Sequence, residues 1–227
     1  MGDSTNVERD VAMMAEWWGR RKVGWLDRAA REFGELVDPY AYYAVNPALD
    51  EIMLANMCFT EWFLFESLLQ DGKTPLGRYI DRHPDGASDR AIERLRQVEV
   101  TQFFSRFEIK GKDAASGICD LRDVRTDTCY EVLDRRLCKR RRWCKGTIAE
   151  RIGCVDDQWQ LVGQVHLYDR ALPQDTAVDG PGEVHPEDIG DGFDTARMSY
   201  YLRLLRDTIG MGGRYVSTVQ AVSLGAS

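Results

Sequence analysis

The sequence predicts an α+β protein with an N-terminal helical half, a small antiparallel five-stranded β-barrel and a C-terminal helix. Over the first hundred residues, apolar side chains recur three or four positions apart, which is the period of an α-helix. From about residue 105 to 170, short segments alternate apolar and polar residues between turn residues, which is typical of antiparallel strands. A last helical pattern, ARMSYYLRLLRDTIG, follows a stretch rich in proline, glycine and acids.

Four helical stretches make up the N-terminal half. The first runs over residues 7–37, and Gly19 and Gly24 predict that it bends or splits near RRKVG. The second, residues 49–69, is apolar nearly all round, so we expect a buried central helix that Gly72 terminates. Pro75 then begins a short helix, and Ser88 or Asp89 caps the next one.

Five short segments predict the strands: RFEIKGKD, GICDLRDV, CYEVLD, GTIAERIGC and QWQLVGQVHLYD. Five strands with one buried face commonly curl into a small barrel, here of SH3-like size. The expected organisation is a helical subdomain at 1–103, the barrel at 104–170, an acidic loop at 171–195, and a C-terminal helix and tail at 196–227.

Two groups of segments carry a resemblance: FTEWFLFESLLQDGKTPLGRYI, and the strand region SRFEIKGKD, CDLRDVRTDTCYEVLD and KGTIAERIGCVDDQWQLVG. Together they resemble a family of uncharacterised bacterial proteins often fused to a SEC-C zinc motif. The resemblance covers about residues 57–163 and implies a helical half followed by a small β-barrel. The SEC-C cysteine cluster itself is absent, since no cysteine follows Cys154, so the zinc function of those fused tails does not carry over.

Composition restricts the function classes. The net charge is −7, and a negative surface repels phosphate, which argues against bulk nucleic-acid affinity. No apolar stretch is long and uninterrupted enough for a membrane span, and MGDSTNVERD is unlike a secretory signal, so we expect a cytoplasmic protein without a membrane partner. Its six cysteines should then be thiols, and they form no C-x2-C pair, so neither a metal nor another cofactor is expected.

The hairpin between the second and third strands places two of these cysteines. A two-residue turn at Thr126-Asp127 pairs Val124 with Cys129. Cys119 then faces the core while Cys129 faces the opposite side, so the two thiols cannot meet. Cys154 is also expected in the core.

The sequence gives little support for a catalytic site. Glu61 and Glu66 on the central helix are about 140° apart and do not form a pair. The histidines, His83, His166 and His185, share no spacing, and His166 is expected to point outward from its strand. DGKTP lacks the glycine of a phosphate-binding loop, and HPEDIGDGFD departs from the EF-hand pattern, leaving weak cation binding as an alternative to a solvated loop.

The basic segment 135–145 is the predicted contact site, and the family resemblance implies that it is an exposed loop joining two strands of the barrel. Its residues for contact with a partner are Arg135, Arg136, Lys139, Arg140, Arg141, Arg142, Trp143 and Lys145. It could bind a protein, bind nucleic acid with Trp143 stacked on a base, or be a solvated loop neutralised by the acidic stretch 156–194. Cys138 and Cys144 within it lack a third metal ligand, although a redox bridge between them is sterically allowed.

The expected function is therefore a non-catalytic protein-interaction module. The alternative is a nucleic-acid-associated protein that uses the basic segment 135–145. A third interpretation is an enzyme with a carboxylate from the central helix.

Overall fold

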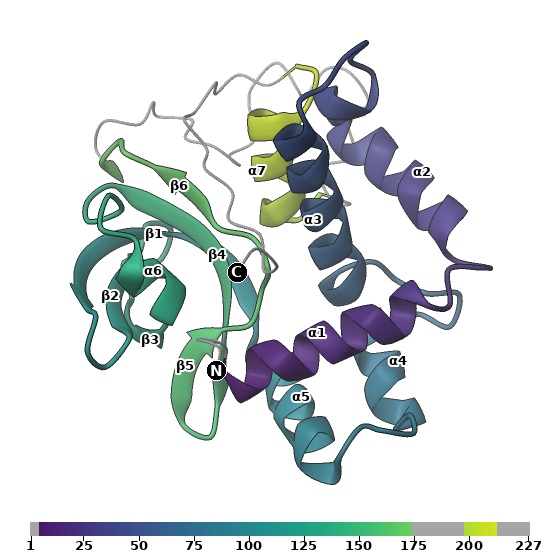
Figure 1. The fold of residues 1–227 in the computed structure, drawn as a ribbon, viewed down its shortest axis with the longest axis horizontal. Coiled ribbons are helices and arrows are strands. Elements are labelled where there is room, and N and C mark those ends of the chain that lie inside the picture. The colour runs from purple at the N-terminus through teal and green to yellow at the C-terminus, as the bar shows by residue number, and fades with distance from the viewer. Residues whose placement is uncertain (1–4, 174–197, 213–227) are drawn as a thin grey trace.

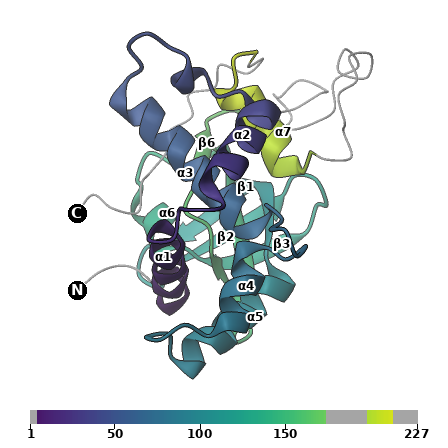
Figure 2. The same ribbon diagram turned by 90° about the vertical axis from the view of Figure 1, so that its right-hand side faces the viewer.

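The computed structural model describes residues 5–173 and 198–212. Figure 1 shows the helices other than α6 on one side of the molecule and a curled sheet on the other, and in Figure 2 the helical side faces the viewer with the strands behind it. The helices are α1 (Asn6–Gly19), α2 (Leu26–Val37), the 3₁₀ turn η1 (Tyr40–Tyr42), α3 (Leu49–Phe65), α4 (Pro75–Arg82), α5 (Asp89–Thr101), α6 (Arg135–Lys139) and α7 (Tyr200–Ile209). The strands are β1 (Phe103–Asp113), β2 (Ile118–Asp123), β3 (Cys129–Leu133), β4 (Thr147–Val155), β5 (Gln158–Leu161) and β6 (Leu167–Asp169).

Capping residues set the helix starts much as the sequence indicates. The predicted break between α1 and α2 is confirmed, and Gly24 in the connection has φ +94°, a conformation that favours glycine. Pro75 occupies the first turn of α4, with the Thr74 hydroxyl accepting from a backbone N–H. Ser88 caps α5 in the same way.

The central helix α3 is shorter than predicted. It ends at Phe65 rather than Leu69, because Glu66 leaves helical geometry with φ −130°. The Glu66 carboxylate turns toward Arg151 on β4 and toward the hydroxyl of Ser199. Tertiary contacts of a charged side chain therefore end this helix before Gly72 is reached.

The predicted α+β class and five-stranded barrel are confirmed. Strands pair in the order β1-β2-β3-β5-β4, and β4 pairs back with β1 to close the barrel. Two details differ from the expectation: β3 and β5 run parallel, and the short sixth strand β6 pairs with β4 beside β5. The closure leaves few unpaired strand edges.

The register of the β2–β3 hairpin differs from the predicted one by two residues. Cys129 lies opposite Arg122 rather than Val124. The carboxylate of Asp123 accepts hydrogen bonds from the backbone of Arg125 and Thr126, so the turn begins earlier than a two-residue turn at Thr126-Asp127 would. A shift of two keeps every side chain on its predicted face.

Two hydrophobic clusters fill the molecule. One joins the helices to the outer face of the barrel and includes Phe63, Leu95 and Tyr201. The other fills the barrel and includes Phe107 and Leu121. Strand β4 separates the clusters and is buried on both faces along most of its length.

Helix α7 returns to the helical half. The buried Tyr201 hydroxyl donates to the carbonyl of Cys58 on α3, and Gly210 forms a β-bridge with Pro39 after α2. Among the residues that the structure describes, no helix combines the length and apolar character needed to cross a membrane.

Candidate functional site

The basic segment 135–145 comprises α6 and the turn that follows it. Figure 1 shows α6 packed on the barrel strands, apart from α2, α3 and α4. Six of its seven cations are exposed, and we refer to them as the basic surface: Arg135, Lys139, Arg140, Arg141, Arg142 and Lys145. The seventh, Arg136, turns inward, where its guanidinium lies 3.0 Å from the Glu8 carboxylate of α1.

Trp143 does not belong to the exposed surface, so this part of the sequence prediction is wrong. Its side chain is 3% exposed and stacks on Tyr168, with ring centroids 4.9 Å apart and planes at 15°. Leu137 and Cys138 are buried in the same cluster. The segment therefore inserts three side chains into the barrel core and leaves six of its seven cations exposed.

Buried or half-buried groups anchor the backbone of this segment. The Asp134 carboxylate caps α6 by accepting from Arg136 N and Leu137 N, each at 2.9 Å. The ammonium of Lys112 donates to the carbonyls of Leu137 and Arg140 at 3.0 and 2.7 Å. The Tyr168 hydroxyl donates to the Lys145 carbonyl at 2.7 Å. These hydrogen bonds therefore fix the backbone that carries the basic surface.

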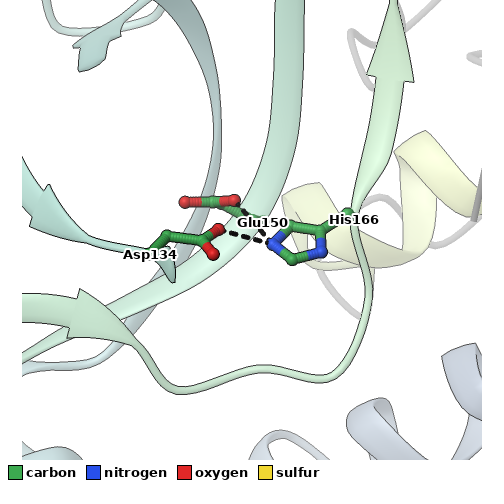
Figure 3. A group of neighbouring side chains, drawn as sticks. All are labelled: Asp134, Glu150 and His166. Carbon is green, nitrogen blue, oxygen red and sulfur yellow. Dashed lines mark hydrogen bonds and ion pairs between the residues drawn. The ribbon is translucent and has the colours of Figure 1, made fainter. Parts of the chain in front are cut away.

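Beneath the basic surface, three titratable side chains meet inside the barrel. Asp134, Glu150 and His166 are each buried, and one donor or acceptor atom from each lies within 4.8 Å of the others. His166 Nε2 is 2.7 Å from Asp134 Oδ2 and 3.2 Å from Glu150 Oε2. Figure 3 shows the two carboxylates converging on that one ring nitrogen. We call these residues the buried triad.

Three separate elements bring the buried triad together. Glu150 lies on β4 between Ile148 and Ile152, and strand alternation turns all three toward the barrel interior. Asp134 follows β3 directly and His166 directly precedes β6. The triad therefore joins the start of α6 to two strands of the barrel.

Burial and mutual attraction shift the pKa values of all three side chains. Burial raises the pKa of Glu150 to about 7. Burial alone would lower the pKa of His166, but the carboxylates of Asp134 and Glu150 outweigh it and raise this pKa to about 10. Burial alone would raise the pKa of Asp134, yet the contact with His166 and the two backbone donors lower it. The favoured state near neutral pH is an imidazolium against the Asp134 carboxylate.

The prediction that His166 points outward is wrong. It assumed one continuous strand from Gln158 to Asp169, but β5 ends at Leu161 and β6 starts at Leu167. Between them the Glu61 carboxylate accepts from the backbone of Gln164 and Val165 at 2.6 and 3.0 Å. The bend interrupts the alternation of inward and outward side chains along the strand, so that alternation no longer predicts the direction of His166.

Sequence reasoning missed the buried triad as a group. One signal was available, because Glu150 shares strand parity with Ile148 and Ile152 and so stands on an apolar face. A charged residue at such a position needs a partner. Nothing in the spacing of Asp134 or His166 indicated that they supply it.

The thiols are arranged differently from the bridge considered between Cys138 and Cys144. Cys138 Sγ lies 3.2 Å from Cys119 Sγ in the barrel core, whereas Cys144 is exposed. The core position of Cys119 and the outward position of Cys129 are confirmed. Cys154, expected in the core, is only half-buried.

The two carboxylates of the central-helix region are held by one buried arginine. Arg151 Nε is 3.1 Å from Glu61 Oε1, and its Nη2 contacts Glu66. Glu61 is fully buried, with its other oxygen occupied by the two backbone donors of the β5–β6 bend. An open groove of about 410 Å³ on the helical half, lined mainly by tryptophans and arginines, includes neither glutamate.

Several predicted features lie outside the described residues: His185, the segment HPEDIGDGFD and most of the acidic loop 171–195. Of the acids that precede that loop, Asp156 pairs with Arg90 on α5 rather than with the basic surface.

No protein-family model matches the chain, and no curated protein or solved structure is significantly similar to it.

Proposed function

We propose that the chain is a protein-interaction module, built on a small SH3-like barrel, that binds an acidic segment of a partner protein through the basic surface. One observation carries the proposal: six exposed cations lie together on a backbone that buried or half-buried side chains anchor. Four of the six are arginines, whose planar guanidinium groups suit two-point contacts with carboxylates.

Anchoring matters for affinity. Ordering a flexible loop on binding costs free energy, and a surface whose backbone is already fixed avoids most of that cost. The clustered positive charge also attracts an acidic partner over distance and accelerates encounter. Both effects favour the basic surface as a docking site over an unanchored charged loop.

The burial of Trp143 weighs against nucleic acid as the partner. Single-stranded nucleic acid usually binds through aromatic platforms that stack on bases as well as through cations. Here the segment's only aromatic side chain is stacked on Tyr168 inside the barrel. What remains exposed is charge alone, in a chain of net charge −7, and this suits a carboxylate-rich protein segment better than a polynucleotide.

An enzyme built on the central-helix carboxylates is less well supported. Both oxygens of Glu61 are already occupied within a filled interior, by Arg151 and by backbone donors. A general acid or base must reach substrate, and a group enclosed in this way serves the fold instead.

The same proposal places the module in the bacterial cytoplasm. All six cysteines are free thiols in the structure, which fits a reducing compartment. The bacterial origin rests on the family resemblance of residues 57–163.

The test compares two probes of similar charge, a fluorescein-labelled glutamate-rich peptide and a single-stranded oligonucleotide, by fluorescence anisotropy at several salt concentrations. The triple variant Arg140→Ala, Arg141→Ala, Arg142→Ala should bind the peptide roughly threefold to a hundredfold more weakly, since each exposed pair contributes about 0.2–1 kcal/mol.

A matched control removes three exposed arginines from the helical half: Arg9→Ala, Arg31→Ala and Arg96→Ala. It changes the net charge equally and should leave peptide affinity within about twofold. Equal loss in both triple variants would show that only net charge matters, and the proposal would fail. Tighter binding of the oligonucleotide at matched salt would instead favour a nucleic-acid partner.

A further inference from the structure

The buried triad has the composition of a metal-ion site. It offers two carboxylates and one imidazole nitrogen from three different elements, converging on one point inside the barrel (Figure 3). Protein ligands about 2 Å from a shared ion lie roughly 3 Å from one another. The two distances from His166 Nε2, 2.7 and 3.2 Å, are close to that spacing.

A second, independent observation comes from Glu150. Its side chain is completely buried, yet neither carboxylate oxygen accepts a hydrogen bond from any residue that the structure describes. Burying an acceptor without a hydrogen-bond donor costs about 1–3 kcal/mol, and more when it is charged. The ion pair with His166 at 3.2 Å involves Oε2 alone, which leaves Oε1 unsatisfied. A cation between the carboxylates would satisfy both oxygens.

Asp134 is already oriented as a ligand. Its Oδ1 is used by the backbone donors Arg136 N and Leu137 N, while Oδ2 faces His166. Outer hydrogen bonds of this kind fix the orientation of metal-binding carboxylates and support the affinity of the site.

We infer that the buried triad binds one divalent first-row transition-metal ion, such as Zn²⁺ or Mn²⁺. The donors are Asp134 Oδ2, His166 Nε2 and both oxygens of Glu150, which together give four donor atoms. Oxygen and imidazole ligands suit these ions. Two carboxylates and a neutral imidazole carry a charge of −2, which a divalent ion balances inside the low-dielectric barrel.

Such an ion would connect the end of β3, the middle of β4 and the residue before β6. Because Asp134 also caps α6, the site would support the backbone that carries the basic surface. The role is structural, since all three side chains are buried within the part of the chain that the structure describes, and a substrate would have to reach an ion enclosed between them. The competing occupant of the same position is the His166 proton, and the experiment separates the two.

The experiment measures metal content directly. Full-length wild type, Glu150→Gln and Glu131→Gln are expressed in medium supplemented with Zn²⁺ and Mn²⁺, purified identically and analysed by inductively coupled plasma mass spectrometry. Glu131 is an exposed glutamate on β3, so the control repeats the same substitution outside the triad. Wild type and Glu131→Gln should carry about one ion per chain. Glu150→Gln should carry less than about a tenth of that, because glutamine cannot supply an anionic ligand.

A spectroscopic measurement does not depend on the folding of Glu150→Gln. Wild type unfolded in guanidinium with a chelator and refolded with Co²⁺ should gain visible absorption bands, which Zn²⁺ present during refolding should suppress. Wild type that is folded but metal-free, and that gains no such bands, would overturn the inference and leave the proton as the occupant. Metal retained equally by Glu150→Gln would overturn it too, by placing the ion elsewhere.

Discussion

Arg151 is a buried charged residue whose guanidinium has several polar partners. It is 2% exposed, and its guanidinium contacts Glu61, Glu66 and the side-chain amide of Gln102. The rings of Phe65, Phe104 and Tyr201 surround it at 5.0, 5.7 and 5.3 Å. The guanidinium is tolerated in the interior because its hydrogen bonds and the opposite charges around it offset the free-energy cost of removing it from water.

Replacing Arg151 therefore tests a buried network. Arg151→Met leaves the fully buried Glu61 without its cation and should lower the free energy of unfolding by about 3–5 kcal/mol, measured by urea denaturation. The matched control is Arg90→Met, which breaks the exposed pair with Asp156 and should cost about 0–1 kcal/mol. Equal costs would show that the buried contacts contribute no more than surface ones.

Thiol accessibility offers a second test at this scale. Cys129 and Cys144 are exposed, whereas Cys58, Cys119 and Cys138 are buried, and burial raises the pKa of each of these three thiols. Iodoacetamide should modify the exposed pair in the native protein and the buried three only in denaturant, because the thiolate is the reactive form. Peptide mapping by mass spectrometry locates the label. Early labelling of Cys119 would contradict the described core.

At the scale of elements, β4 is the strand on which both halves depend. Its alternation sends Glu150 into the barrel and Arg151 toward the helices, so neighbouring residues serve different cores. It pairs with β1, β5 and β6. Its entry point is Gly146, at φ +94°, where a β-carbon would stand 2.2 Å from the Asp169 carbonyl oxygen.

Gly146 and Gly24 form a natural pair of test sites, because both have φ +94° but only Gly146 is crowded. Gly24→Ala should cost about 1–2 kcal/mol from backbone strain alone. Gly146→Ala adds a clash with backbone and should cost about 3 kcal/mol or more. Thermal and urea unfolding of both variants gives the comparison. Similar costs would mean that β6 can move away from β4 without loss.

The elements were predictable where local chemistry decides them. Pro75 and Ser88 begin helices because caps act within one turn, and strand parity placed Cys119 and Cys129 on the correct faces. The predictions that were wrong, for His166 and Trp143, depend on contacts between residues far apart in the sequence. His166 turned inward because Glu61, over a hundred residues earlier in the chain, binds the preceding backbone. Trp143 is buried because it packs against Tyr168 and His166, which lie more than twenty residues later in the chain, and no local pattern shows that contact.

On the scale of the whole molecule, the helical half and the barrel share a boundary rather than a linker. The helical cluster includes Phe104, Ala149 and Val162 from the barrel side, and α7 closes it from the other end of the chain. Contacts of such extent are typical of one cooperative unit.

Cooperativity can be measured by hydrogen–deuterium exchange in increasing denaturant. Peptides from α3 and from β4 should lose protection with the same free energy and the same denaturant dependence, because unfolding either removes the packing surface of the other. A helical half that exchanges while the barrel stays protected would show two independent units.

The enclosure of the buried triad has a consequence for kinetics. With Asp134, Glu150 and His166 all out of contact with solvent, whatever occupies their centre can leave only when the barrel opens locally. Exchange with the surroundings would then follow the opening rate of β6 and α6 and be independent of chelator concentration once chelator is in excess. An ion bound as the barrel closes would therefore stay only until the next local opening, and its lifetime in the folded protein would report how often that part of the barrel opens.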